Sequence, residues 1–329
     1  MVNNIKPNYR KYISFLIYSI VIAFIGYMLL AFWSGWHDFI KVIEDIGFVG
    51  LIVALLLSLF NYILRFIRWQ ICLGVQGYKV PLINSLGIYL SGFALTTTPG
   101  KSGEAIRSYF LKKQYDVSYT NSLALLINER FYDFLAIFLL AIVGINLFVT
   151  YKYFIIFSFF FIVIFALFIL KKGVLEFFLE FVCTYDNKVA FFLRRVLEIG
   201  ISVRRINTVG VFSLNLVLSV LAWGSEAYAL YFVLDLLSLS VKIDYAIFTY
   251  AISMLIGALS FLPGGLGSTE ATMVTILTLN NINQPIAIAV TLFIRVVTLW
   301  FAVLIGILSL LIVFFKLSIN KNESNIFLE

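Results

Sequence analysis

The chain has 329 residues, of which 62% are hydrophobic and only 12% are charged, and its mean hydropathy is +1.02. Because a soluble domain is nearer a quarter charged, this composition excludes a soluble enzyme, a disordered chain and a fibrous protein. The net charge of +7 comes from Lys and Arg in short segments between apolar runs, as the positive-inside rule expects. We therefore expect one all-α polytopic membrane domain over residues 1–329, with no nucleic-acid partner.

Six apolar runs are long enough to cross a bilayer as helices, whereas β-barrel strands would be short alternating segments. Two further apolar stretches, Leu82–Thr98 and Tyr245–Leu262, have only about 17 residues and end at or just before Pro-Gly. Each is followed by a short helical stretch, Gly103–Lys113 and Ser268–Leu279. The six expected spans are approximately Tyr12–Trp33, Phe48–Gly74, Leu123–Val149, Tyr153–Leu170, Val209–Leu237 and Pro285–Phe315.

Charge placement decides how the two short stretches sit. The basic segments Lys101–Asp116 and Lys171–Arg205 should both be cytoplasmic, while the acidic loop Ser34–Gly47 suits the outside. Both basic segments share one side only if the first short stretch enters and leaves on the same face. We therefore expect re-entrant helical hairpins at 82–113 and 245–279, an amphipathic cytoplasmic segment at 171–206, and both termini in the cytoplasm. Irregular backbone is not tolerated in lipid, so the hairpins must pack among the spans or line a cavity.

The hairpins also indicate an internal repeat. Pro99 and Gly100 correspond to Pro263 and Gly264, and an arginine follows each proline at similar spacing, Arg130 after 31 residues and Arg295 after 32. Each half, 48–149 and 209–315, then consists of span, hairpin and span. Three crossings separate the hairpins, so they enter from opposite faces. This inverted-topology repeat is the plan of many transporters.

Three sets of charged residues are candidates for chemistry. Arg65 and Arg68, followed by Trp69, could snorkel to the interface or face the interior. Glu104 and Arg107 on the first hairpin, with Glu129, Arg130 and Asp133 on the next span, could form a network that only fixes the hairpin. Alternatively, Arg107 or Arg130 binds a lipid phosphate through its planar fork of donors. In the third set, Arg295 should pair with Glu226 or Glu270, and Glu270 should also be stabilised at a helix N-terminus.

Glycines mark both turns. Gly100, Gly103, Gly264, Gly265 and Gly267 would let the chain reverse tightly and let backbones approach closely. A half-helix that starts at such a turn directs free N–H groups inward, which favours an anionic ligand. The alternative is a turn without a ligand.

Three sequence blocks resemble a known family: PGKSGEAIRSYFL (99–111), ERFYD (129–133) and LPGGLGSTE (262–270). They are similar to the signature blocks of the lysylphosphatidylglycerol synthase transmembrane-region family, also called the flippase-like domain family, and Arg68-Trp69 fits an upstream block. The family often has Arg-Leu where this chain has Lys101-Ser102. The resemblance implies a polytopic protein that moves lipids between leaflets. In bifunctional members a soluble aminoacyl-transferase domain follows, and we expect none here because the chain ends soon after its last span.

We therefore predict a protein of the cytoplasmic (inner) membrane that translocates an anionic phospholipid or a lipid-linked molecule, such as a lipid-linked sugar. With two cysteines, one histidine and no Walker motif, we expect no metal, no cofactor and no nucleophile–His catalysis. Energy would come from a gradient, with a proton carried by Glu104, Glu226 or Glu270, or the movement would run downhill. The candidate substrate-binding residues are Arg68, Gly100, Gly103, Glu104, Arg107, Glu129, Arg130, Asp133, Glu226, Pro263, Gly264, Gly265, Gly267, Glu270 and Arg295.

Two alternatives remain open. One is a membrane transferase acting on a lipid-linked substrate, with Glu129 or Asp133 as the base. The other is a non-catalytic partner of a separate synthase or transferase, with Lys171–Arg205 as the partner surface. Reconstitution separates the three, because a flippase moves lipid unchanged, a transferase changes its mass and a scaffold does neither.

Overall fold

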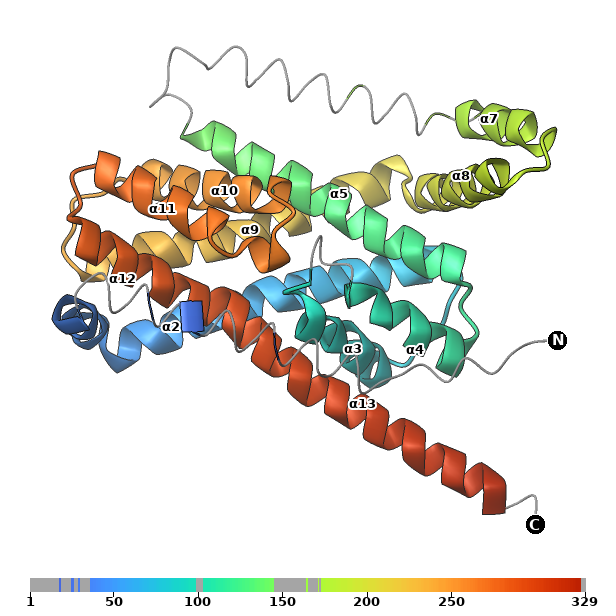
Figure 1. Cartoon of the computed structure of the whole chain (residues 1–329), viewed down its shortest axis with the longest axis horizontal. Helices are drawn as coiled ribbons and strands as arrows, with labels where there is room; N and C mark the ends of the chain where they lie inside the picture. The colour runs from blue at the N-terminus through green and yellow to red at the C-terminus, as the bar shows by residue number, and fades with distance from the viewer. Residues whose placement is uncertain are drawn as a thin grey trace.

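The computed structural model describes residues 36–98, 103–144 and 173–326, with a few isolated positions outside these ranges. The described part of the chain is a bundle of α-helices (Figure 1). Its elements are α2 (Trp36–Val75), α3 (Leu82–Ser91), η1 (Gly92–Leu95), α4 (Ile106–Tyr115), α5 (Tyr119–Val143), α7 (Val174–Cys183), α8 (Lys188–Ile206), α9 (Val209–Leu236), α10 (Ile243–Leu259), η4 (Pro263–Gly265), α11 (Ser268–Leu279), α12 (Gln284–Arg295), η5 (Val296–Trp300) and α13 (Phe301–Ile326).

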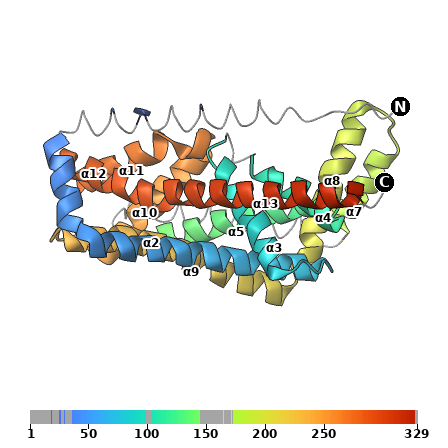
Figure 2. The ribbon, with the colours of Figure 1, turned by 90° about the horizontal axis from the view of Figure 1, so that it is seen from below.

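The long helix α2 bends sharply near its start. Gly47 adopts φ 64°, which separates a short helix from the apolar run that follows, and the bend is visible in Figure 2. The expected loop Ser34–Gly47 is therefore wrong for residues 36–46, which are helical. Val42 and Ile46, one turn apart, are buried against the bundle, so this segment gains packing that a loop would forgo.

Three described helical segments are long and apolar enough to cross a membrane, namely Phe39–Val75, Val209–Leu236 and Gln284–Leu317. They coincide with three of the six predicted spans. A fourth predicted span is represented by α5, which has 25 residues but carries three charged side chains. The predicted spans Tyr12–Trp33 and Tyr153–Leu170 lie outside the described residues, so the number of spans stays a prediction.

The last span is one nearly continuous helix with a local defect. α12 passes through the π-helical segment η5, directly after Arg295, into α13, which runs past α3 and beyond the other helices (Figure 1). Such π-helical turns occur mostly as single insertions in α-helices, frequently at functional sites. The extra residue of the π-helical turn rotates the side chains of α13 relative to those of α12, directly after the buried Arg295.

Each short apolar stretch forms a helix that packs on the short helix following it, α3 on α4 and α10 on α11. Residues 99–102 lie outside the described residues, and the re-entrant course of both hairpins stays a prediction. The two hairpins contact long helices from the other half of the chain: α3 packs mainly on α13, and α10 packs on α5 about as extensively as on its own neighbours α9 and α11. Each hairpin therefore leans on a long helix from the other half of the sequence.

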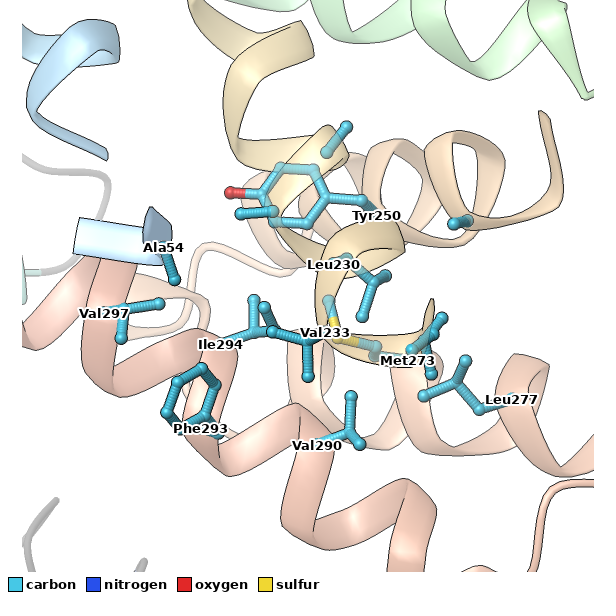
Figure 3. Packing of buried hydrophobic residues seen from close by; sticks show 14 of the residues in the cluster. Ala54, Leu230, Val233, Tyr250, Met273, Leu277, Val290, Phe293, Ile294 and Val297 are labelled. Atoms are coloured by element: carbon cyan, nitrogen blue, oxygen red, sulfur yellow. The ribbon is translucent and has the colours of Figure 1, made fainter. Parts of the chain in front are cut away.

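Two large groups of buried apolar side chains surround the hairpins. One gathers around α3, α4 and the neighbouring parts of α2 and α13, and the other around α9 to α12. Figure 3 shows the second group, in which aliphatic side chains of α9, α11 and α12 interdigitate below the ring of Tyr250. Figure 2 shows α2 and α9 side by side along one edge, the most extensive helix pair of the described bundle.

The predicted amphipathic segment 171–206 contains two helices, α7 and α8, which pack on each other while α8 leans on α5. Arg204 of α8 binds Glu176 of α7 at 2.7 Å. Hydrogen bonds from backbone N–H groups, first its own and then that of Gly173, hold the pKa of Glu176 below its ordinary value. Phe177, Phe178 and Phe181 are exposed along α7, so this pair of helices has an apolar outer face.

Candidate functional site

The first hairpin is fixed to α5 by buried ion pairs. Arg107 Nη1 lies 2.8 Å from Glu129 Oε2, and Arg107 Nη2 lies 3.1 Å from Glu104 Oε2. Arg130 Nη2 contacts the same Glu104 oxygen at 2.9 Å. The other Glu104 oxygen accepts a hydrogen bond from Thr96 Oγ1 at 2.6 Å. The network expected between Glu104, Arg107 and the acids of α5 is thus present.

Two arginines of α2 extend this network. Arg65 Nη2 and Arg68 Nη2 lie 3.1 Å and 2.8 Å from the two oxygens of Asp133, and Arg68 Nη1 also donates to Ser219 Oγ on α9. Their side chains are only 8% and 1% exposed, so the snorkelling alternative is wrong for both. Trp69 is no interface anchor either, because it is buried and its Nε1 donates to Ser85 Oγ.

We call this set the hairpin network. Counted over the described residues, it holds four positive charges against three negative ones, an excess of one positive charge. Burial without full neutralisation is costly, and Glu226, a carboxylate that lines one cavity with Arg65, can offset this excess. Its members are Arg65, Arg68, Arg107, Arg130, Glu104, Glu129 and Asp133.

Aromatic rings cover the faces of the buried guanidinium groups. The Arg107 Cζ atom lies 4.5 Å from the ring centre of Tyr89, and Arg65 Cζ lies 5.7 Å and 5.5 Å from those of Phe93 and Trp223. These cation–π contacts position the planar guanidinium groups, whose edges form the ion pairs with Glu104, Glu129 and Asp133. Within the described residues, the buried Nε atoms of Arg65 and Arg107 make no hydrogen bond.

The second hairpin has its own buried arginine. Arg295 Nε lies 2.6 Å from Glu270 Oε1, and Arg295 Nη2 donates to the carbonyl of Gly264 at 2.8 Å. The predicted pairing of Arg295 in the bundle is confirmed, with Glu270 as its partner. Glu270 also accepts the N–H of Gly267 at 2.6 Å and so caps α11 at its N-terminus. Glu226 accepts a hydrogen bond from the hydroxyl group of Tyr250.

The two hairpins share one pattern of ion pairing. In each, a glutamate just beyond the turn binds an arginine on the following long helix, Glu104 with Arg130 and Glu270 with Arg295. The partners are 26 and 25 residues apart along the chain. The matched spacing read from the sequence thus corresponds to matched contacts.

A small cavity of about 40 Å³ lies where the two sets meet. Arg65 and Tyr62 line it from α2, Glu226 from α9, Tyr250 from α10, and Arg295 and Thr298 from the last span. Because a water molecule needs roughly 10–15 Å³ of such volume and two to four polar partners, the cavity suits a few waters or a small polar group. We call it the central cavity.

The turn glycines serve two different purposes. A Cβ on Gly103 would lie 2.5 Å from Leu95 Cβ, so this glycine permits the close approach that we predicted. A Cβ on Gly267 would meet nothing within 4 Å, but its φ of 85° is unfavourable for other residues. Close packing was thus the wrong reason for Gly267. Gly264 and Gly265 also have positive φ, directly after Pro263, whereas Gly100 lies outside the described residues.

Several cavity residues were missed by sequence reasoning. Arg65 was noted but not chosen, and Tyr62, Thr96, Tyr250 and Thr298 carried no signal beyond being polar positions in apolar runs.

Among the described residues, no group of three or more His, Cys, Asp or Glu side chains is arranged to hold a metal ion.

The sequence profile described as the lysylphosphatidylglycerol synthase TM region matches residues 16–306, most of the chain. The chain belongs to this family. The family resemblance drawn from the Pro-Gly blocks is therefore confirmed, and it assigns the chain to membrane-embedded proteins with a lipid-related role.

Archaeal relatives of the family cover nearly the whole chain. The UPF0104 membrane protein MJ1595 of Methanocaldococcus jannaschii is 26% identical, over 92% of this chain and 96% of the relative. The UPF0104 membrane protein PH1989 of Pyrococcus horikoshii is 23% identical, over 87% and 94%. A UPF0104 membrane protein of Methanothermobacter thermautotrophicus is 24% identical, over 93% and 94%.

Proposed function

We propose that this protein translocates an anionic phospholipid, or a lipid-linked molecule with an anionic head group, between the leaflets of its membrane. The observation that carries the proposal is the central cavity, where Arg65 of the hairpin network and Arg295 of the second hairpin line one space. A phosphate that passes between the hairpins would meet a guanidinium group from either side.

The electrostatics support this role. Moving a charged group through hydrocarbon without partners is the barrier to lipid movement. Arg65 and Arg295 both line the central cavity, and arginine binds phosphate through two parallel N–H donors. An anionic head group would therefore replace water with preformed donors while its apolar chains stay in lipid.

The size of the cavity indicates a closed state. Ligand pockets usually measure about 300–1,000 Å³, whereas the central cavity measures about 40 Å³. Translocation would require that one hairpin moves away and opens the cavity to one leaflet. In this proposal the hairpins are re-entrant and belong to an inverted repeat, which the exchanged packing of α3 on α13 and α10 on α5 supports.

The test is transport in liposomes of defined composition. Fluorescent phosphatidylglycerol or phosphatidylcholine is placed in both leaflets, and a membrane-impermeant reductant added outside reports the fraction that reaches the outer leaflet. We expect protein-dependent movement of phosphatidylglycerol that falls in Arg65→Gln and stays unchanged in Arg195→Gln, whose side chain is 58% exposed. Mass spectrometry of the recovered lipid should show no change in mass.

The results separate the alternatives. Equal rates in protein-containing and empty liposomes for every anionic lipid tried would refute translocation. A new lipid mass would favour the transferase, and neither movement nor modification would favour a non-catalytic partner. Topology is tested with single cysteines at Asp116 and Asn187, which the hairpin proposal puts on the same side of the membrane. If an impermeant reagent reaches only one of them in intact cells, the first hairpin is not re-entrant.

A further inference from the structure

A second, larger depression lies outside the charged site, between α3 and α13. Its volume is about 360 Å³, and it is lined mainly by aliphatic side chains. Leu86, Ile88 and Leu90 form one wall, and Ile305, Leu308 and Ile312 form the other. We call this depression the α3–α13 groove.

The groove is apolar along its length and polar at one end. Asn84, Gln114 and Lys316 line that end, and the described residues of the lining include no acidic side chain. Lys316 is exposed and forms no ion pair with any described residue. Lys113, in the last turn of α4 just before Gln114, adds positive charge near the same end, whereas Lys112 pairs with Asp116.

The length of the groove fits one leaflet. Its lining on the last helix runs from Ile305 to Lys316, a rise of about 16 Å along the helix at 1.5 Å per residue. The hydrocarbon core of a bilayer is about 30 Å thick, so one leaflet accounts for about 15 Å. An amphiphile with its head group at Lys316 would therefore extend its chain along the whole groove.

We propose that the α3–α13 groove binds one acyl chain of an anionic phospholipid, with the phosphate at Lys316 and the glycerol region near Gln114 and Asn84. An extended protein segment fits poorly, because its backbone groups would lack partners along the apolar walls. The groove is separate from the central cavity. Gly306 packs so tightly on η1 that an added Cβ would lie 2.1 Å from Ala94 N, which closes the inner end.

The binding test does not involve transport. The full chain is placed in nanodiscs containing a trace of phosphatidylglycerol or phosphatidylcholine that carries a photoreactive diazirine on one acyl chain, and labelled peptides are mapped by mass spectrometry. We expect labelling of 83–90 and 305–312. One lysine near an anionic head group contributes about 1 kcal/mol, so phosphatidylglycerol should label about fivefold more than phosphatidylcholine.

Two kinds of variant test the assignment. Lys316→Gln should remove the preference for phosphatidylglycerol, whereas Lys242→Gln, an exposed lysine before α10, should keep it. Leu308→Trp should fill the groove and suppress labelling by both lipids. Leu311→Trp is the matched control, because Leu311 is similarly exposed, at 62% against 55%, but does not line the groove.

Equal labelling by the two lipids in the unmodified protein would overturn the proposal, as would equal loss in Leu308→Trp and Leu311→Trp. If Leu308→Trp is not monodisperse, the comparison of Lys316→Gln with Lys242→Gln still decides. Because nanodisc labelling needs no movement between leaflets, failure of the groove and failure of translocation are separate results.

Discussion

Asp133→Asn removes the carboxylate that binds both Arg65 and Arg68. The side chain of Asp133 is 6% exposed, so the change leaves two buried guanidinium groups facing a neutral amide. Breaking a buried ion pair by removing one partner is destabilising by about 3–5 kcal/mol. Since 1.4 kcal/mol corresponds to a factor of ten, the population of the open state should rise by about two to three orders of magnitude.

The chain contains a built-in reporter for this opening. Cys72 is buried one turn after Arg68, and its sulfur lies near the amide groups of Asn128 and Asn215. The only other cysteine, Cys183, is exposed and can be replaced by serine. The rate at which a thiol reagent labels Cys72 under native conditions then measures opening around the hairpin network.

The matched control is Glu198→Gln, which breaks the exposed pair Arg195–Glu198 with side chains 58% and 42% exposed. Exposed pairs contribute less than about 1 kcal/mol, so labelling of Cys72 should change less than about fivefold. Arg65→Met added to Asp133→Asn should slow labelling again, because it removes one uncompensated charge. If Asp133→Asn accelerates labelling no more than Glu198→Gln does, the ion pairs of Asp133 do not stabilise the packing of α2 on α5.

Three further outcomes are expected in thermal unfolding of the detergent-extracted protein. Gly306→Ala should lower the free energy of unfolding by about 1–3 kcal/mol, because the added Cβ would overlap the backbone of η1. The control Gly224→Ala should not lower it, because the nearest atom to its added Cβ lies 3.9 Å away. Exchanging Arg295 and Glu270 should restore only part of the stability lost in either single variant, because arginine at 270 cannot accept the capping N–H. Gly267→Ala and Gly267→Leu should lower the free energy of unfolding by the same amount, about 1–2 kcal/mol, because the strain comes from the backbone φ and not from side-chain contact. A much larger effect of Gly267→Leu would contradict this explanation.

The short helices of the two hairpins could be predicted because their signals are local. A run of about 17 apolar residues that ends at or just before Pro-Gly is at the lower length limit of a span and has a defined end, and the helix boundaries follow within a few residues. The pairing of Arg295 was predictable for a related reason. A charge deep in an apolar helix needs a partner, and Glu226 and Glu270 were the candidate acids.

The direction of Arg65, Arg68 and Trp69 was not predictable in the same way. A helix end near the interface has the same composition whether its arginines reach water or point inward. The partners that decide, Asp133 and Ser219, lie 65 and 151 residues after Arg68. Only the packing of α2 between α5 and α9 determines which face they occupy.

The exchanged packing of the hairpins has a mechanical consequence. Because α3 packs on α13 and α10 packs on α5, a rocking motion that separated residues before and after α8 would separate each hairpin from a long helix that it contacts. The bodies that stay together during any rearrangement would combine a hairpin from one stretch of the sequence with a long helix from the other. Distances measured between α3 and α13 should then change less than those between α3 and α5, although α3 and α5 are neighbours in the chain.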